Sequence, residues 1–355
     1  MLRMHTRPLI SSVLARRGLA IATSRPATLT APPLTASPQI EKLNPPTEAS
    51  HFKGPPHPHP SHDQNPHTTG DWVLFHPVYT VEENQAVKVL TRPPVTMSDK
   101  AASTFSKILR WGFDLVSGYK HKEIPKGSNM TFEELTKGGY IMTEAQWLSR
   151  ILFLESIAGV PGMVAATARH LRSLRLMQRD AGWIHTLLQE AENERMHLMT
   201  FMTLKQPGIM FRTMILGAQG VFYNTFFLAY LFNPKAAHRF VACLEEEAVV
   251  TYTRLIEALR AGHLPAWQDH PAPGIAIDYW RLPANAKLLD VIYAVRSDES
   301  THRFVNHSLA NLELQDINPF ALGEPDMHIK GTKTGFERGE AAAYVRSNRP
   351  ANRPA

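Results

Sequence analysis

Between about residues 71 and 322, hydrophobic positions recur with the period of an amphipathic helix. Four long helices are predicted from their capping residues. The first begins after Thr143, which forms a capping-box pattern with Gln146, and runs past Glu155. The others begin near Asp180, at Asn233-Pro234 and near Asn285, and end at Pro207-Gly208, near Gly262 and toward Pro319, respectively. Because strand-like alternation is scarce, the chain is predicted to be all-α.

One segment is apolar enough to meet a membrane. Residues Thr213 to Phe232 form a run of 20 positions without a charged side chain, long enough to span a bilayer. However, Gln219, Asn224 and two glycines interrupt it, and a spanning helix would place its flanking helices in different compartments. We therefore expect this helix to lie in the membrane interface or in the protein core.

Two other surfaces fit a membrane contact. An earlier predicted helix carries the apolar side chains Phe105, Ile108, Leu109, Phe113 and Leu115. Later in the chain, one helix edge carries Arg169, Arg172, Arg175 and Arg179, opposite Leu171, Leu174 and Met177. Such an edge is typical of a helix beside anionic lipid headgroups. A buried amphipathic helix would look similar, so both alternatives stay open.

The two ends of the chain differ from its middle. Residues 1–30 are rich in Arg, Ser and Thr and contain no acid, a composition typical of a mitochondrial transit peptide. Residues 31–70 are Pro- and His-rich and are predicted to be disordered. Residues 71–322 form the predicted folded domain, and residues 323–355 form a polar C-terminal tail, which we expect to be frayed after Gly331.

Charge and cysteine content exclude several classes of protein. The net charge is +6, but five arginines in residues 1–40 contribute +5 without any acid, which leaves +1 for the other 315 residues. A nucleic-acid-binding function therefore loses its main support, and we expect no nucleic-acid partner. The single cysteine, Cys243, excludes an intramolecular disulfide and an iron–sulfur cluster built by this chain alone.

Two Glu-x-x-His units lie in predicted helices, Glu194 with His197 and Glu299 with His302. This spacing puts the carboxylate and the imidazole on one helical face. In ferritin-like four-helix bundles, two such helices and one inward carboxylate from each of two others hold a pair of iron ions. The chain is therefore predicted to form a ferritin-like four-helix bundle with a di-iron core, together with additional membrane-facing helices.

Two further carboxylates are available at suitable places. Glu155 stands within a nearly continuous apolar run, where an ionised carboxylate is costly unless it is paired or bound to a metal. The alternative for Glu155 is a salt bridge, for instance to Arg150. The fourth carboxylate should come from the run 245–247, in which the hydrophobic period leaves Glu245 and Glu246 nearly tied.

The chemistry of this ligand set suits iron. Four carboxylates balance two ferrous ions, and two imidazoles complete six protein ligands while leaving positions open for oxygen. Zinc fits less well, because thiolates are missing and six ligands on four helices suit two ions. Asn193 and Asp298 directly precede the glutamates of the two units, where short polar side chains hold metal ligands by hydrogen bonds. The alternative is that both residues are solvated.

Four short segments together resemble the signature motifs of the mitochondrial alternative oxidase family. They are Leu154-Glu155-Ser156, Asn193-Glu194-Arg195-Met196-His197, Leu244-Glu245-Glu246-Glu247-Ala248 and Arg296-Ser297-Asp298-Glu299-Ser300-Thr301-His302. Their order and spacing match over about residues 71–322. The family more often has Thr at position 156, Ala at 297 and Ala-His at 300–301, but no departure touches a ligand. The regulatory cysteines of the plant type have no counterpart here.

The resemblance implies which residues form the site. It selects Glu245 as the fourth carboxylate ligand and Tyr252 as a redox-active tyrosine beside the metals. It gives Asn193, Asp298 and Trp280 as hydrogen-bond partners around the ligands. It also implies a quinol pocket and an Arg110/Asp114 pair in the first helix. The pocket residues would be Arg150, Leu154, His238, Ala248 and Thr251, although plain core packing is the alternative for Leu154 and Ala248.

The resemblance also implies a function. The protein would oxidise ubiquinol and reduce O2 to water at two iron ions without pumping protons. It would be a homodimer on the matrix face of the inner mitochondrial membrane, attached to one leaflet only. The main rival is a di-iron quinone hydroxylase of ubiquinone biosynthesis, which shares the ligand set but inserts oxygen into its substrate. A ferritin-like iron store and a metal-free helical membrane protein are more distant alternatives.

Overall fold

The computed structural model describes residues 74–117, 119, 122, 124–125 and 130–349. Within these residues the chain is helical and has no β-strand, as predicted from the sequence. The elements are α1 (Val81–Ala86), α2 (Met97–Ser117), α3 (Phe132–Lys137), α4 (Glu144–Leu176), α5 (Trp183–Met202), α6 (Ile209–Phe232), α7 (Pro234–Arg260), α8 (Gly274–Tyr279), α9 (Leu288–Asn311), η2 (Pro319–Leu322), α10 (Met327–Lys330) and α11 (Arg338–Asn348). The expected transit peptide (1–30) and disordered segment (31–70) lie outside the described residues.

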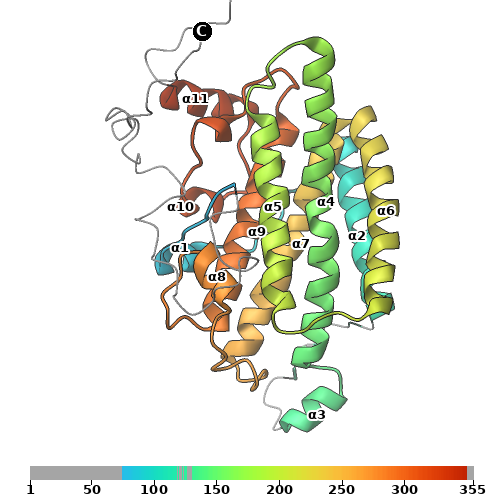
Figure 1. Ribbon diagram of the computed structural model, residues 1–355, viewed down its shortest axis with the longest axis vertical. Coiled ribbons are helices and arrows are strands. Elements are labelled where there is room, and N and C mark those ends of the chain that lie inside the picture. Colours follow the sequence, from blue (N-terminus) through green and yellow to red (C-terminus); the bar gives the residue numbers. More distant parts are fainter. Residues whose placement is uncertain (1–73, 118, 120–121, 123, 126–129, 350–355) are drawn as a thin grey trace, which may run out of the picture. The chain divides into compact units, whose positions relative to one another are not determined.

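Four long helices form the bundle (Figure 1). Helix α4 packs against α5, and α7 packs against α9. Helix α6 lies on α4, and α2 lies on α7. The close approach of α4 to α5 depends on Gly162, since a Cβ there would lie 2.7 Å from the carbonyl oxygen of Leu187. The bundle of α4, α5, α7 and α9 carries all six predicted metal ligands.

Local capping explains where two of these helices begin. Thr143 and Gln146 form the predicted capping box of α4, and the side chain of Asn233 accepts the amide of Ala236 at the start of α7. Asp180 stands before the start of α5 rather than at its cap, but its Oδ2 still accepts the amide of Ile184 at 2.9 Å. The predicted capping residues Thr143 of α4 and Asn233 of α7 are therefore confirmed.

The start of α9 differs from the prediction. The helix begins at Leu288 instead of near Asn285. Asp290 Oδ2 accepts the amide of Lys287 at 2.8 Å, and the amide of Leu288 donates to the carbonyl oxygen of His270 at 2.8 Å. The helix start is therefore fixed partly by a contact with a distant segment, which local sequence does not reveal.

The expectation of a frayed tail after Gly331 is wrong for the described part of that segment. Helix α11 forms there, after the short helix α10, and Phe336 and Ala341 are buried. The amide of Phe336 donates to Ser308 Oγ at 2.8 Å, which fixes this segment on α9. Lys330 is also buried, and its charge is paired with Glu324 at 2.8 Å. A polar segment folds here because α9 supplies partners for its polar groups.

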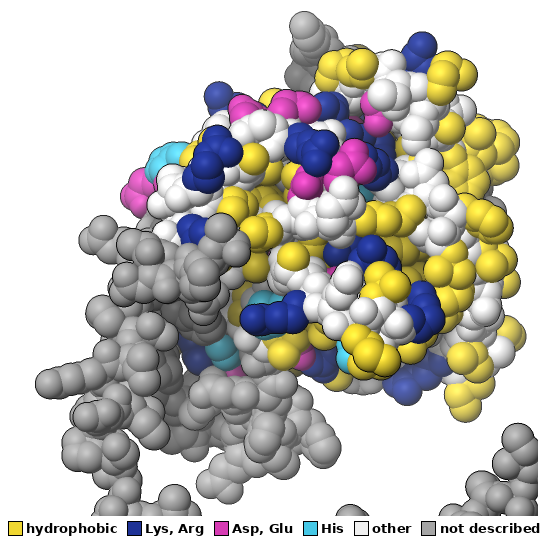
Figure 2. All heavy atoms as spheres, turned by 90° about the horizontal axis from the view of Figure 1, so that it is seen from above, with side chains coloured by type: hydrophobic (Ala, Val, Ile, Leu, Met, Phe, Trp, Pro, Cys, Tyr) yellow, Lys and Arg dark blue, Asp and Glu magenta, His cyan; other side chains and the backbone are white. Residues whose placement is uncertain are grey.

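Helices α2 and α6 expose much of their apolar surface. Each of α4 and α6 contains an apolar stretch of 18 residues. Only 17% of this stretch is buried in α6, whereas 56% of it is buried in α4. Seen from above, hydrophobic side chains gather along the right-hand edge of the surface, the side on which α6 lies in Figure 1 (Figure 2). The exposed side chains on these two helices include Phe105, Ile108, Leu115, Met210, Leu216, Val221 and Leu228. Helix α4 is mainly a core helix, whereas α6 presents an apolar face.

The predicted arginine edge of α4 requires a correction. The side chain of Arg169 is only 2% exposed and pairs with Asp180 at 2.9 Å. Its guanidinium also lies 4.0 Å from the ring centroid of Trp183. Arg179 lies beyond the end of the helix, because Met177 ends α4 with a positive φ of 52°. The edge available to lipid headgroups is therefore smaller than the sequence pattern predicts.

Candidate metal centre

Six buried carboxylate and imidazole side chains converge between the four bundle helices. Helix α4 supplies Glu155, α5 supplies Glu194 and His197, α7 supplies Glu245, and α9 supplies Glu299 and His302. They form two groups of four, Glu155, Glu194, His197 and Glu299 in one and Glu194, Glu245, Glu299 and His302 in the other. Within each group the candidate ligand atoms lie within 4.8 Å of one another. Two metal positions that share two carboxylates are thereby outlined.

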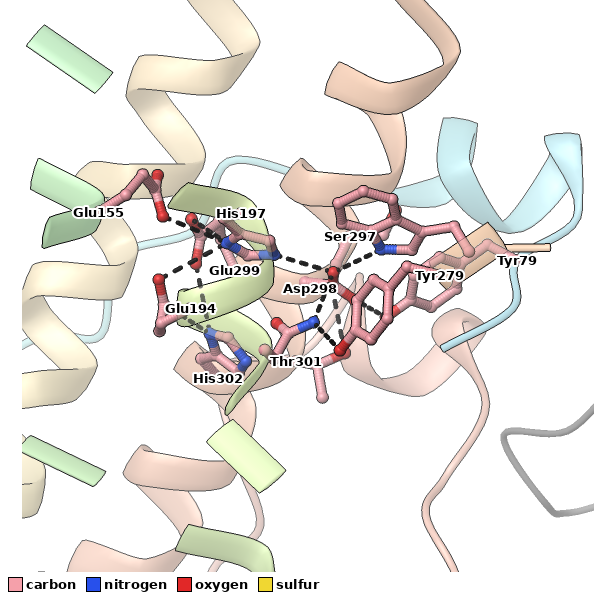
Figure 3. A network of polar contacts seen from close by, with 12 residues as sticks. Tyr79, Glu155, Glu194, His197, Tyr279, Ser297, Asp298, Glu299, Thr301 and His302 are labelled. Carbon is pink, nitrogen blue, oxygen red and sulfur yellow. Dashed lines mark hydrogen bonds and ion pairs between the residues drawn. The ribbon is translucent and has the colours of Figure 1, made fainter. Parts of the chain in front are cut away.

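The histidines point their Nδ1 atoms at the shared carboxylates (Figure 3). His302 Nδ1 lies 2.7 Å from Glu194 Oε1 and 3.3 Å from Glu299 Oε2. His197 Nδ1 lies 3.5 Å from Glu194 Oε2 and 3.6 Å from Glu299 Oε1. It also lies 3.3 Å from Glu155 Oε2. The two Glu-x-x-His units thus face each other across the bundle.

Apart from these ion-pair contacts, several of the cluster atoms have no hydrogen-bond partner among the described residues. Among the described residues, both oxygens of Glu194, Glu155 Oε2 and His197 Nδ1 are buried without a hydrogen bond. Each such orphaned polar atom costs about 1–3 kcal/mol. Bound cations would satisfy all four atoms at once, so the residues present fit a metal centre.

The electrostatics of the cluster support the same conclusion. Burial raises the pKa of Glu155 to about 8. Burial and the charges of Glu299 and Glu194 raise the pKa of Glu245 well above its usual range. Burial also opposes ionisation of Glu194, but the positive charges of the two histidines outweigh it and lower the pKa of that carboxyl. The cluster holds more potential negative charge than the two histidines can balance, which favours metal cations there.

The structure separates the three consecutive glutamates of α7. Glu245 faces the cluster. Glu246 accepts from His307 Nε2 at 2.8 Å and from the amide of Arg92 at 2.7 Å. Glu247 pairs with Arg110 at 3.1 Å. Each residue is rotated by about 100° from the last, so only Glu245 reaches the cluster.

The salt bridge considered for Glu155 is not formed. Arg150 pairs instead with Asp114 at 2.7 Å, and Asp114 also accepts from Arg110 at 2.9 Å. The expected Arg110/Asp114 pair is therefore present. Glu155 faces the cluster and accepts a hydrogen bond from the hydroxyl of Tyr252.

Asp298 organises the polar contacts behind His197. Its Oδ2 accepts from His197 Nε2 and from Asn193 Nδ2, both at 2.9 Å, and from Trp280 Nε1 at 2.8 Å. Asn193 and Asp298 are 0% and 2% exposed, so the solvated alternative for these two residues is wrong. The structure therefore brings together the three partner residues that the resemblance implied.

Sequence reasoning missed two tyrosines of this network. The hydroxyl of Tyr79 donates to Asp298 Oδ1 at 2.5 Å, and Asn193 Nδ2 donates to the hydroxyl of Tyr279 at 2.9 Å. Tyr279 directly precedes Trp280, which was a usable signal. Tyr79 stands 219 residues before Asp298, and no local pattern connects the two.

Tyr252 lies at the edge of the cluster. It is 3% exposed, and its ring stacks on Phe201 with the centroids 6.3 Å apart. Burial and the charges of Glu155 and Glu299 raise the pKa of Tyr252 well above its usual range. Its phenol is therefore protonated at neutral pH and donates to Glu155.

The residues expected in a quinol pocket are only partly brought together. The guanidinium of Arg150 lies between the rings of Phe113 and Tyr119, 4.7 Å and 4.4 Å from their centroids. Thr251 joins the same network, 3.3 Å from Arg110 Nη1, while Leu154 and Ala248 are partly exposed.

His238 stands apart from this network. It lies 13 residues before Thr251 on α7, on the order of 20 Å along the helix axis. Its ring nitrogens face Tyr230 Oη at 3.2 Å and Asn306 Oδ1 at 2.9 Å. The structure does not join His238 to the other expected pocket residues.

Comparison with known proteins gives the family. Residues 79–311 match the family model for the alternative oxidase. A relative from Cryptococcus neoformans var. grubii, named "Alternative oxidase, mitochondrial", is 54% identical over 86% of this chain and 79% of its own length. Proteins of the same name from Emericella nidulans and Aspergillus niger are 52% and 46% identical, over 75% and 86% of this chain and 75% and 84% of their own lengths. With its buried glutamate and histidine cluster, the chain belongs to the alternative oxidase family of oxidoreductases.

Proposed function

We propose that this protein is a mitochondrial ubiquinol oxidase that reduces O2 to water at two iron ions. The observation that carries the proposal is the pair of four-residue groups that share Glu194 and Glu299. Because two carboxylates belong to both groups, they would hold two metal ions close together, and such a pair suits a reaction that transfers more than one electron. The family membership supports quinol and O2 as the substrates.

The ligand set divides evenly between the two proposed ions. Glu155 and His197 would hold one ion, Glu245 and His302 would hold the other, and Glu194 and Glu299 would contribute to both positions. Iron bound there supplies the capacity to take electrons from quinol and pass them to O2. The carboxylates are hard ligands that suit the ferric state, and the imidazoles complete the set.

The residues around the ligands prepare them for this role. Asp298 Oδ2 accepts the Nε2 hydrogen of His197, so when this imidazole is neutral, as a metal ligand must be, its lone pair is on Nδ1, which faces the cluster. Asn193 and Trp280 donate to the same oxygen, and Tyr79 donates to the second oxygen of Asp298, so these bonds hold the acceptor in place. This arrangement fixes both the tautomer and the orientation of the ring.

Quinol would reach the site from the membrane side. The head group of a quinol is polar and its tail is apolar, so a pocket beside the apolar faces of α2 and α6 suits it. Arg150 is held by Asp114 and two aromatic rings. Leu154 stands on the same helix, α4, and Thr251 and Ala248 stand on α7. We assign the head group to this region and leave His238 outside it.

The proposed location is the matrix face of the inner mitochondrial membrane, with attachment to a single leaflet. The exposed apolar faces of α2 and α6 support attachment, and a protein on one side of the bilayer has no route for pumped protons. The proposal includes a homodimer, supported by the exposed Met163, Leu171 and Leu174 on one face of α4.

Oxygen uptake tests the proposed reaction. Membranes that contain this protein should consume O2 with ubiquinol as donor in the presence of cyanide, because carboxylate and imidazole ligands replace the haem that cyanide binds. The quinone product should be free of inserted oxygen. Uptake that stops at cyanide concentrations sufficient for haem oxidases would contradict the proposal, and a hydroxylated product would favour the quinone hydroxylase instead.

Membrane attachment is expected to resist salt and yield to detergent. High salt removes only electrostatic attachment, whereas the apolar faces of α2 and α6 hold by burial in the interface. Fractionation of salt-washed and detergent-treated mitochondria measures this. Protease added from the intermembrane side of intact inner membrane should leave residues 74–349 uncut, and cleavage there would contradict attachment to the matrix leaflet.

A further inference from the structure

An N-terminal strap, which we define as residues 74–96 and which includes α1, lies against α9 and reaches the metal centre. Asn84 connects it to α9 through its Oδ1, which accepts from Ser297 Oγ at 2.6 Å, and its carbonyl oxygen, which accepts from Arg296 Nη2 at 2.6 Å. Farther along, the carbonyl oxygen of Lys88 accepts from Arg303 Nη1 at 2.9 Å. Two separate points along α9 therefore fix the strap.

This attachment brings one strap side chain to Asp298. The hydroxyl of Tyr79 donates to Asp298 Oδ1, the oxygen that His197, Asn193 and Trp280 leave free (Figure 3). Asp298 thus receives four donors, three on one oxygen and Tyr79 alone on the other. Removing the Tyr79 hydroxyl would leave Oδ1 of a carboxylate that is 2% exposed without this donor.

The phenol is held as a donor. Burial and the charge of Asp298 raise the pKa of Tyr79 well above its usual range, so the hydroxyl keeps its proton. A donated hydrogen bond draws negative charge toward itself and weakens the carboxylate as an acceptor for its other partners. The electron density on His197 therefore depends on whether Tyr79 donates.

The strap also lines a cavity beside the site. Phe75 and Tyr79 line a small cavity between α5 and α9, together with Glu190, Asn193 and His302. The strap therefore forms one wall of a cavity that reaches the metal-ligand candidate His302.

We propose that Tyr79 is a positioning residue of the metal centre, which orients Asp298 and sets how strongly His197 Nδ1 donates to the metal. The inference rests on the proposed function only in that His197 binds a metal ion. Without the Tyr79 hydroxyl, Asp298 accepts more strongly from His197 Nε2, and the imidazole becomes a richer donor. A richer donor stabilises the oxidised metal, so the reduction potential of the centre should fall.

The test compares Tyr79→Phe with Tyr344→Phe in the full-length, metal-loaded protein. Tyr344 is a matched control, because its hydroxyl donates to the carbonyl oxygen of Gly323 at 3.1 Å, outside the metal centre. Metal content and thermal stability come first, followed by the midpoint reduction potential and the Mössbauer spectrum. Only Tyr79→Phe should lower the potential and change the spectrum. Its kcat should fall about threefold to tenfold, less than the effect of a direct partner of a ligand, while the KM for quinol stays constant.

A second replacement separates hydrogen bonding from packing. 3-Fluorotyrosine at position 79 has a more acidic phenol and donates more strongly, so it should raise the potential, in the opposite direction to Tyr79→Phe. A purely structural role would lower stability in both proteins and leave both potentials at the parent value, which would overturn the inference. A parent protein that binds no metal would overturn the proposed function, and this inference with it.

Discussion

Glu299→Ala should lose its bound metal and its quinol oxidation together. Glu299 belongs to both four-residue groups, so this single change removes an oxygen ligand from each proposed ion. Outer partners of metal ligands alone contribute about 10–100-fold in affinity, and we expect more than about 100-fold for this ligand. Glu194→Ala should behave in the same way, because Glu194 is the other shared carboxylate.

Loss of metal in Glu299→Ala should not come from misfolding. Burial and the negative charge of Glu194 raise the pKa of Glu299, which means that its ionised form is disfavoured in the metal-free protein. Removing this carboxylate from the metal-free protein therefore removes a group whose ionisation is unfavourable, and it should not lower the free energy of unfolding. Metal analysis combined with thermal unfolding of the metal-free proteins checks this expectation.

Glu247→Ala provides the matched control for metal content. It lies two residues after Glu245 on the same helix, but it pairs with Arg110 and faces away from the cluster. This variant should keep its metal. A Glu299→Ala protein with full metal content and parent activity would contradict the ligand assignment, and so would a Glu247→Ala protein without metal.

The sequence predicted those parts of the fold that depend on nearby residues. Thr143 and Asn233 cap their helices through contacts within a few positions, so their patterns could be read directly. The ordered C-terminal segment could not, because the amide of Phe336 finds its partner in Ser308, 28 residues earlier. Arg169 was misread for the same reason, since Asp180 and Trp183 beyond the helix end draw it into the protein.

In the metal centre, too, the features that depend on nearby residues could be predicted, and those that depend on distant residues could not. The spacing of Glu194 with His197 and of Glu299 with His302 is local, and it identified one carboxylate and one imidazole on each helix. The hydrophobic period left Glu245 and Glu246 nearly tied, and only the family resemblance selected Glu245. The physical reason lies in His307 and Arg92, which both donate to Glu246. Such long-range partners decide which of two equally apolar faces points inward.

Tyr252→Phe should fold and bind metal, yet lose nearly all quinol oxidation. Splitting O2 to water takes four electrons, whereas one quinol supplies two, so a side chain that lends an electron and a proton near the metals would help. Tyr252 is suitably placed, because its hydroxyl donates to Glu155, whose Oε1 is positioned to receive the proton. A phenyl ring has nearly the same volume and keeps the stacking on Phe201, but it cannot supply that proton.

The expected loss of turnover in Tyr252→Phe is about a hundredfold or more, which corresponds to about 2.7 kcal/mol in the barrier. The alternative is that Tyr252 is a buried tyrosine with only a structural hydrogen bond. Losing that bond would lower the free energy of unfolding by about 1 kcal/mol and leave turnover intact. Steady-state quinol oxidation, with metal content and thermal stability measured on the same preparations, separates the two. Turnover near the parent rate at equal metal content would show that the hydroxyl is structural, because the ring and the metal would then suffice for the reaction.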